Sequence, residues 1–171
     1  VQIWYPASEP SDSLYPYMDY AEQRIESIAK RIEKSEGFIK PIKNVIGNSY
    51  FKAKPINQKF PIILFSHGLG GYKTQNSINI ESLVSQGYIV VAPDHTYDAT
   101  ITIFEDGSTV DFESGLPDDV SPEEFWDIRI PQINMRASDI SFIIDKLQIM
   151  KEYELYDSIN FSKIGIFGHS F

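Results

Sequence analysis

The sequence predicts a protein of the α/β class with a mostly parallel sheet. Three short runs are almost continuously apolar, as strands buried on both faces usually are; they cover 60–65, 88–92 and 163–167. Between the first two runs, residues 77–85 have a helical pattern that stops at Gly87. The apolar positions of that helix are Ile78, Leu83 and Val84. Strand, helix and strand at this spacing form a βαβ unit, and such units build parallel sheets.

The segments before this unit are more irregular. Val1–Tyr5 is expected to form an edge or antiparallel strand that ends at Pro6, and 7–16 a loop rich in Ser, Pro and Asp. A helix is expected over about 19–34, ended by Gly37, and 38–59 has no clear period. The apolar stripe of that helix consists of Ile25, Ile28, Ala29 and Ile32.

The segments after this unit predict a hairpin and a long helix. Residues 100–112 are expected to turn at Asp106–Gly107, a favoured type I′ pair. Ser121, followed by proline and by glutamate three residues on, predicts a capping box. The helix should extend to about Tyr153, bent or interrupted near Pro131. Its second half carries a stripe that can cover a sheet, formed by Ile140, Ile143, Ile144 and Leu147.

Composition restricts the function classes. The 171 residues are 42% hydrophobic, enough for a core, and suggest a single domain over 1–171. A net charge of −9 argues against nucleic-acid binding. There is no cysteine, no metal-ligand spacing and no nucleotide-binding glycine motif, so no cofactor or metal is predicted. No membrane-length apolar stretch or leader is visible, and the compartment stays open.

The charges are unevenly distributed. From Thr74 to Ile128 there is no Lys or Arg, although this stretch holds twelve of the acidic residues. They are Glu81, Asp94, Asp98, Glu105, Asp106, Asp111, Glu113, Asp118, Asp119, Glu123, Glu124 and Asp127. This stretch is either a solvated acidic surface or a field that favours a cationic substrate head group.

The last residues of the chain carry the strongest chemical signal. Gly168-His169-Ser170-Phe171 follows the third apolar run and has the pattern G-x-S-x. In α/β-hydrolases this pattern forms the nucleophile elbow, a strained strand-to-helix turn that exposes the serine hydroxyl above the sheet. Ser170 is therefore the candidate nucleophile, which needs a base to take its proton.

A second motif, Ser66–Gly71, directly follows the first apolar run. Its small residues allow backbone N–H groups to point into an open site, as an oxyanion hole requires. In α/β-hydrolases one donor comes from this loop and the other from the residue after the nucleophile. The expected donors are the N–H groups of Leu69 and Phe171. The alternative is a plain glycine turn at the end of a strand.

None of the three histidines is expected to be the base. The side chain of His169 should point away from the neighbouring Ser170 hydroxyl, and His67 should stabilise the oxyanion loop by hydrogen bonding. If a strand separates Asp94–His95 from the elbow, the gap is roughly 10 Å. A general base must come within about 3 Å of the hydroxyl. Asp94 and His95 should instead connect loops beside the site.

Together these motifs resemble a known family. The segments 60–70, 87–95 and 168–171 are similar to the platelet-activating factor acetylhydrolases of the plasma or type II kind, with the bacterial members nearest. The resemblance implies a calcium-independent serine esterase that removes short or oxidised acyl chains from phospholipids. It implies that Ser170 is the nucleophile and that Leu69 and Phe171 are the oxyanion donors. The helix over 19–34 resembles the region that contacts lipid surfaces in this family, although such helices also pack in cores.

The chain departs from the family pattern in one respect. In α/β-hydrolases the acid and the histidine follow the serine, so both are expected after residue 171. We therefore expect an α/β-hydrolase fold truncated at the elbow, with its last strand exposed at the sheet edge and little activity by itself. The alternatives are a broader carboxylesterase, such as a dienelactone-hydrolase or polyester-cleaving relative, and a non-catalytic half-domain that binds a partner.

Overall fold

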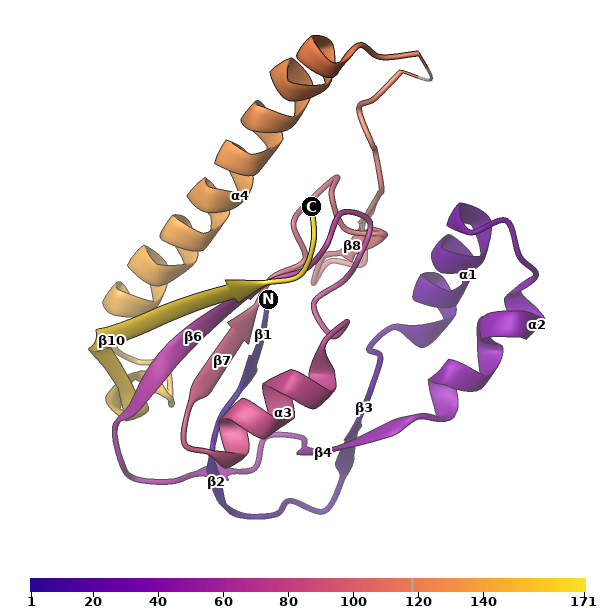
Figure 1. The fold of residues 1–171 in the computed structure, drawn as a ribbon. Helices are drawn as coiled ribbons and strands as arrows, with labels where there is room; N and C mark the ends of the chain where they lie inside the picture. The colour runs from indigo at the N-terminus through magenta and orange to yellow at the C-terminus, as the bar shows by residue number, and fades with distance from the viewer. Residues whose placement is uncertain (118) are drawn as a thin grey trace.

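The computed structural model describes residues 1–117 and 119–171, so Asp118 of the acidic stretch lies outside the described residues. A four-stranded sheet forms the centre in the order β1-β7-β6-β10 (Figure 1). These strands are β1 (Gln2–Trp4), β7 (Ile89–Ala92), β6 (Phe60–Ser66) and β10 (Ile159–Gly168). β6 is parallel to β7 and β10, and β1 is antiparallel to β7. The βαβ prediction and the antiparallel first strand are both confirmed.

The two faces of this sheet are covered by different helices. Ile62 and Leu64 of β6 pack on one face in a cluster that contains Ile140, Ile143 and Leu147 of α4 (Pro122–Ile149). Val90 of β7 packs on the other face with Ile80 of α3 (Ser77–Ser85). Alternate strand residues therefore contact α3 and α4, as the period of two requires.

Within α3 one expectation needs correction. Ile78 is 83% exposed, and Ile80 is the residue that is fully buried.

The segment before β6 is more ordered than expected. Two small antiparallel pairs join residues some 30 to 50 positions apart: β2 (Ala7–Glu9) with β5 (Lys54–Pro55), and β3 (Leu14–Pro16) with β4 (Ile46–Tyr50). Both 7–16 and 38–59 were therefore wrongly expected to lack strands. Strands of two to five residues are too short for a readable period, and pairing alone defines them.

The expected helix over 19–34 is α1 (Ala21–Arg31), followed by α2 (Glu36–Ile39) and the 3-10 helix η1 (Lys40–Asn44). Gly37 does not end α1, because it lies inside α2. The chain leaves α1 through Glu33, whose φ of 54° is left-handed. Three of the four stripe residues pack inward: Ile25 and Ala29 are buried with Ile39, and Ile28 packs against them. The expectation was wrong for Ile32, which follows the last residue of α1 and is 41% exposed.

The hairpin is confirmed, but its turn is not type I′. β8 (Ile101–Ile103) pairs antiparallel with β9 (Thr109–Asp111), and the connecting loop has five residues. Gly107 has a φ of 84°, whereas Asp106 is not among the residues with positive φ. A type I′ turn requires positive φ at both central residues, so this loop is of another kind.

The capping box of α4 is confirmed. The side chain of Ser121 accepts from the Glu124 N–H at 3.2 Å, and the carboxylate of Glu124 accepts from the Ser121 N–H at 3.0 Å. The helix is uninterrupted through Pro131 and ends at Ile149 rather than near Tyr153. Pro131 is exposed, so the carbonyl group that loses its partner there faces water, which makes the proline tolerable.

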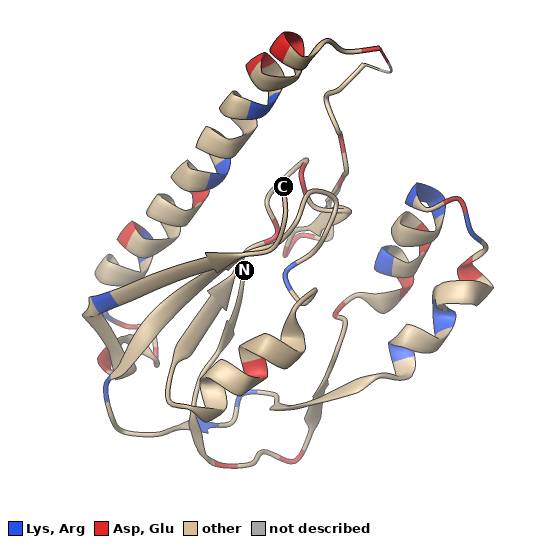
Figure 2. Cartoon of the chain, viewed as in Figure 1, with Lys and Arg blue, Asp and Glu red and all other residues tan. Residues whose placement is uncertain are grey.

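β10 lies at the edge of the sheet, as expected, and its middle residues are exposed. The charges are unevenly placed: Lys and Arg alternate with acidic residues from α1 through η1, whereas the hairpin and the loop that leads to α4 carry acidic residues and no Lys or Arg (Figure 2). None of the helices in the described part of the chain is both long and apolar enough to cross a bilayer.

Candidate active site

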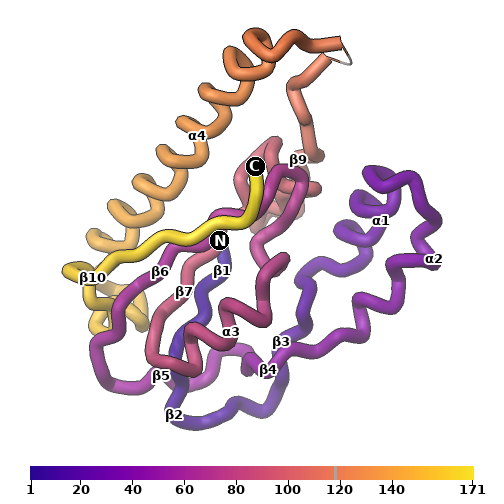
Figure 3. Tube along the Cα trace, in the orientation of Figure 1, coloured from indigo at the N-terminus to yellow at the C-terminus, as the bar shows by residue number. Residues whose placement is uncertain are grey.

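Ser170 lies at a strained turn directly after β10. Its φ is 42°, a left-handed value that non-glycine residues rarely adopt. Gly168 is in register with Ser66, and the next N–H, of His169, donates to the Ser66 carbonyl at 3.1 Å. The chain then leaves the sheet beside the loop that follows β6 (Figure 3). The Ser170 side chain is exposed, as an accessible hydroxyl must be.

The loop after β6, residues 67–71, packs against this turn. Gly70 adopts a φ of 67°, and the N–H of Gly71 donates to the Gly68 carbonyl at 2.8 Å. The hydroxyl of Thr100 donates to the Gly70 carbonyl. These bonds hold the loop in a tight turn.

Most N–H groups of this loop have partners. Gly68 donates to the side chain of Gln75 at 3.2 Å, and Gly70 donates to the Asp98 carbonyl at 2.7 Å. Among residues 1–117 and 119–171, no acceptor takes the N–H of Leu69 or of Phe171. Neither residue is buried, so both N–H groups can donate to a ligand, and so can the N–H of Ser170, which also has no acceptor among the described residues.

The buried side chain of His67 joins this loop to the residues that follow β7. Its Nδ1 donates to the Gly68 carbonyl at 2.7 Å, and its Nε2 accepts from the His95 N–H at 3.0 Å. Burial lowers the pKa of His67 to about 4. With both ring nitrogens engaged, His67 supports the loop and is not free to act as a base, in line with the expectation for it.

His95 belongs to a second chain of hydrogen bonds. Its Nε2 lies 3.0 Å from the Ser66 hydroxyl and its Nδ1 lies 2.8 Å from Asp139 of α4. β6 separates the end of β7 from β10, as the sequence argument supposed. Within the described residues, no hydrogen bond joins the Ser170 hydroxyl to a histidine. His95 therefore connects β6, β7 and α4.

His169 forms its hydrogen bond with Gln75 rather than with Ser170. Its Nδ1 lies 3.0 Å from Nε2 of Gln75, whose other amide atom accepts from Gly68. Gln75 thus joins the elbow to the loop after β6. Sequence reasoning missed Gln75, Asp139 and Arg136, since a glutamine, an aspartate and an arginine on helices or turns have no readable signal there.

A buried ion network lies behind the loop. The guanidinium of Arg24 contacts Asp19 at 2.8 Å and Asp94 at 2.7 Å, and Nζ of Lys73 contacts Asp19 at 2.6 Å. Asp94 also accepts from the Lys73 N–H at 2.7 Å. Burial alone would raise the pKa of the Asp94 carboxyl, but the charges of Arg24 and Lys73 outweigh it and lower that pKa. The network joins α1 to the end of β7.

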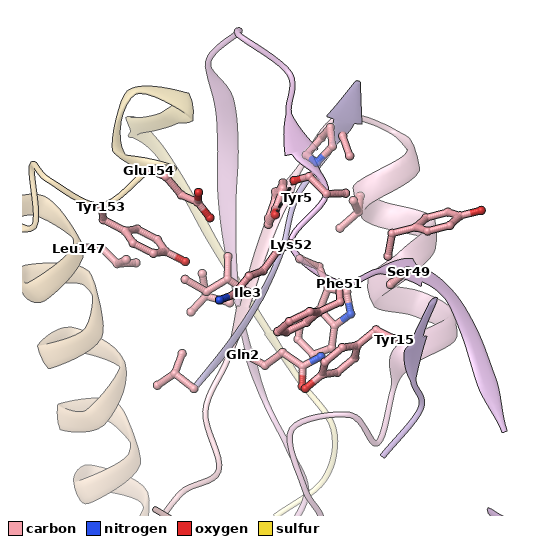
Figure 4. Close-up of a pocket in the computed structure, with 18 of the residues that line it drawn as sticks. Gln2, Ile3, Tyr5, Tyr15, Ser49, Phe51, Lys52, Leu147, Tyr153 and Glu154 are labelled. Atoms are coloured by element: carbon pink, nitrogen blue, oxygen red, sulfur yellow. Dashed lines mark hydrogen bonds between the residues drawn. The ribbon is translucent and has the colours of Figure 1, made fainter. Parts of the chain in front are cut away.

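A large cleft lies elsewhere, beside β1 (Figure 4). Its volume is about 1380 Å³. Its lining includes Ile3, Tyr5, Phe51 and Tyr153, and contains neither Ser170 nor Leu69. The cleft is therefore separate from the candidate nucleophile.

The mixed sheet with helices on both faces has the α/β-hydrolase fold. A ferulic acid esterase from Streptomyces cinnamoneus superposes with a TM-score of 0.73 over 98% of this chain and 43% of its own, at 24% identity. The sequence model described as "Platelet-activating factor acetylhydrolase, isoform II" matches residues 1–171. The chain belongs to that family.

Curated relatives agree with this assignment. The platelet-activating factor acetylhydrolase of Bos taurus is 34% identical over 134 residues, which are 67% of this chain and 30% of the relative. That of Cavia porcellus is 26% identical over 201 residues, covering 100% of this chain and 44% of the relative. The chain thus spans less than half the length of these relatives.

Proposed function

We propose that the protein is a serine ester hydrolase that cleaves short or oxidised acyl esters of phospholipids. The observation that carries this proposal is the juxtaposition of an exposed serine at a left-handed φ of 42° with two N–H groups that have no acceptor among the described residues. Membership of the acetylhydrolase family supports the substrate class. The esterase neighbour supports only the fold.

The reaction follows the usual course of acyl transfer. The Ser170 oxygen attacks the ester carbonyl carbon and loses its proton to a base, while the carbonyl oxygen becomes an oxyanion. The N–H groups of Leu69 and Phe171 donate to that oxyanion. The bond to the alcohol oxygen then breaks, and the alcohol leaves with the proton. Water repeats the attack on the acyl-serine and releases the carboxylic acid.

The base is proposed to lie after residue 171 in the intact protein, together with the acid that orients it. The order serine, acid, histidine in α/β-hydrolases supports this, and so does the greater length of the relatives. Residues 1–171 alone would keep only the oxyanion contribution, a residual of roughly 10³–10⁴ over water.

Ser66 is the competing nucleophile, because Ser66, His95 and Asp139 are hydrogen-bonded in the order of a catalytic triad. Two features favour Ser170. Ser66 lies inside a paired strand, one position after the α3-facing Phe65, so its side chain faces α4. Its partner His95 is 1% exposed, which leaves little space for an ester.

The decisive experiment compares Ser170→Ala with Ser66→Ala in the intact protein. Hydrolysis of p-nitrophenyl acetate and labelling by a fluorophosphonate should be abolished by the first change and retained by the second. Peptide mass analysis should locate the label on Ser170. Retention of full esterase activity by Ser170→Ala would refute the proposal, and no activity in the wild-type protein would favour the non-catalytic half-domain.

The substrate class needs a separate comparison. An acetylhydrolase should turn over a phospholipid with an acetyl group at position 2 at least as efficiently as a soluble aryl acetate, and should lose rate steeply as the acyl chain lengthens. A broader carboxylesterase of the dienelactone-hydrolase or polyester-cleaving kind should favour the aryl ester and ignore the phospholipid.

Contact with a lipid surface through the helix over 19–34 is part of this proposal. Ile25, Ile28 and Ala29 pack inward and cannot supply it. The contact would use Ile32 and Phe38, which are 41% and 72% exposed, and the neighbouring Lys30 and Lys34. Phe38→Ser should then weaken sedimentation with phosphatidylserine vesicles, with hydrolysis of p-nitrophenyl acetate unchanged. Equal sedimentation of the variant and the wild type would exclude this surface.

A further inference from the structure

Arg136 is a buried cation that the proposed reaction does not use directly. It lies in the middle of α4 and is 6% exposed. A buried charge is costly unless it is paired and hydrogen-bonded. Its contacts therefore show which part of the molecule it stabilises.

Two of these contacts hold the oxyanion loop, one directly and one through Asp98. Nη1 of Arg136 donates to the His67 carbonyl at 2.6 Å, and Nε donates to the Asp98 carboxylate at 2.5 Å. The backbone carbonyl of Asp98 in turn accepts from the Gly70 N–H. Arg136 thus holds the residues on both sides of Gly68–Leu69, by its hydrogen bond to His67 and through its ion pair with Asp98.

A third contact is on the elbow. The guanidinium carbon of Arg136 lies 4.5 Å from the centroid of the Phe171 ring. A guanidinium over an aromatic face is attracted to it, more strongly when water is excluded. Arg136 therefore contacts both segments that supply the two unpaired N–H groups, those of Leu69 and Phe171.

One part of the guanidinium remains unpaired. Nη2 of Arg136 is buried and has no hydrogen-bond partner among the described residues. An unsatisfied buried donor is destabilising, and such groups in native proteins call for a reason beyond packing. Placement between the two donor segments is such a reason.

We propose that Arg136 is a positioning residue of the oxyanion hole, which sets the relative placement of the Leu69 and Phe171 N–H groups. The proposal rests on the function proposed above. Loss of one oxyanion donor costs about 10²–10³ in kcat. Displacing two donors without removing them should cost less, about 10- to 100-fold in kcat.

The chain offers a matched control on the same face of the same helix. Arg129 lies seven residues earlier, is 4% exposed and has its guanidinium 5.8 Å from the same Phe171 ring. Its hydrogen bonds go to the Ser114 carbonyl and the Gln132 side chain rather than to the oxyanion loop. Arg129→Met removes a buried cation beside Phe171 but leaves the loop contacts intact.

The test measures kcat and KM of the intact protein for p-nitrophenyl acetate and for its thiono analogue, in which sulfur replaces the carbonyl oxygen. Arg136→Met should lower kcat 10- to 100-fold for the oxygen ester, with KM changed less than about threefold. In this variant the ratio of kcat for the oxygen ester to kcat for the thiono ester should also fall. Sulfur is a weak hydrogen-bond acceptor, so the thiono ester depends little on the oxyanion hole and loses less rate when the hole is disturbed. Arg129→Met should keep kcat within about threefold and keep the preference.

Arg136→Lys keeps a cation that can pair with Asp98 but cannot make both hydrogen bonds, so its kcat should be intermediate. This variant decides the question if Arg136→Met does not fold. An unchanged kcat and oxygen preference in the folded Arg136 variant would overturn the inference, as would equal losses in Arg129→Met. Fluorophosphonate labelling of the wild type at Ser170 is checked first, so failure of the proposed function is recognised separately.

Discussion

The carbonyl oxygen of His169 lies 3.0 Å from the point where a side chain on Gly68 would begin. The elbow and the oxyanion loop are therefore in contact through their backbones, at a spacing that real Cβ atoms rarely show. The same point lies 3.5 Å from Cβ of Ser170. The absence of a side chain at position 68 therefore allows Ser170, the proposed nucleophile, to lie this close to the loop.

This close approach predicts that Gly68→Ala impairs catalysis more than folding. The methyl group must move the loop or the elbow by a few tenths of an ångström, and misplacements of this kind are costly in active sites. We expect kcat for p-nitrophenyl acetate to fall about tenfold, with a stability loss of about 1 kcal/mol.

Gly165→Ala is the matched control for this change. It lies on β10, and an added Cβ would meet only Ile63 at an ordinary 3.7 Å. Its kcat should stay near that of the wild type. Equal kcat values for the two variants would show that the close contact at Gly68 does not affect catalysis.

The buried, neutral His67 predicts acid sensitivity. Its pKa of about 4 lies below the ordinary 6.5, so the unfolded chain binds the proton first as the pH falls. Above pH 6.5 the contribution of neutral His67 to the free energy of unfolding is fully present. As the pH falls from 6.5 to about 4, this contribution decreases by about 1.4 kcal/mol per pH unit. Urea unfolding of the wild type and of His67→Gln between pH 7 and 4.5 measures the difference. Parallel curves for the two proteins would contradict it.

The ion network behind the loop predicts a large effect for Arg24→Met. This change leaves Asp19 and Asp94 buried with only Lys73 as a cation, and breaking a buried pair from one side costs about 3–5 kcal/mol. Thermal unfolding measures the loss. Lys43→Met breaks an exposed pair with Glu22 and should cost at most about 1 kcal/mol. A loss of stability as small for Arg24→Met as for Lys43→Met would show that the buried network does not stabilise the fold.

The capping box predicts a stability effect without a catalytic one. Ser121→Ala removes the acceptor for the Glu124 N–H and should cost about 1 kcal/mol of unfolding free energy. Arg136 lies four turns further along α4, so kcat should not change. A fall in kcat for the folded variant would show that the start of α4 influences the site.

Most of the central sheet and the helices that cover it could be predicted from local sequence patterns. Apolar runs identify β6 and β7, the capping box identifies the start of α4, and Gly-x-Ser after a third run places Ser170 at a strand end. These features depend on neighbours in the chain, which is why they can be read without the structure. The small pairs β2–β5 and β3–β4 could not be read, because each depends on a partner at least 30 residues away.

By itself the sequence determined the central strands, the hairpin, the three longest helices, the Gly-x-Ser turn after β10 and the loop of small residues after β6. Only the tertiary structure decided which groups surround that loop. It placed His95 between Ser66 and Asp139, and it brought Arg136 from α4 over Phe171 while bonding it to His67. The physical reason is that a hydrogen bond or a cation–π contact depends on position in space, and residues from three elements meet there only after the sheet and α4 have packed.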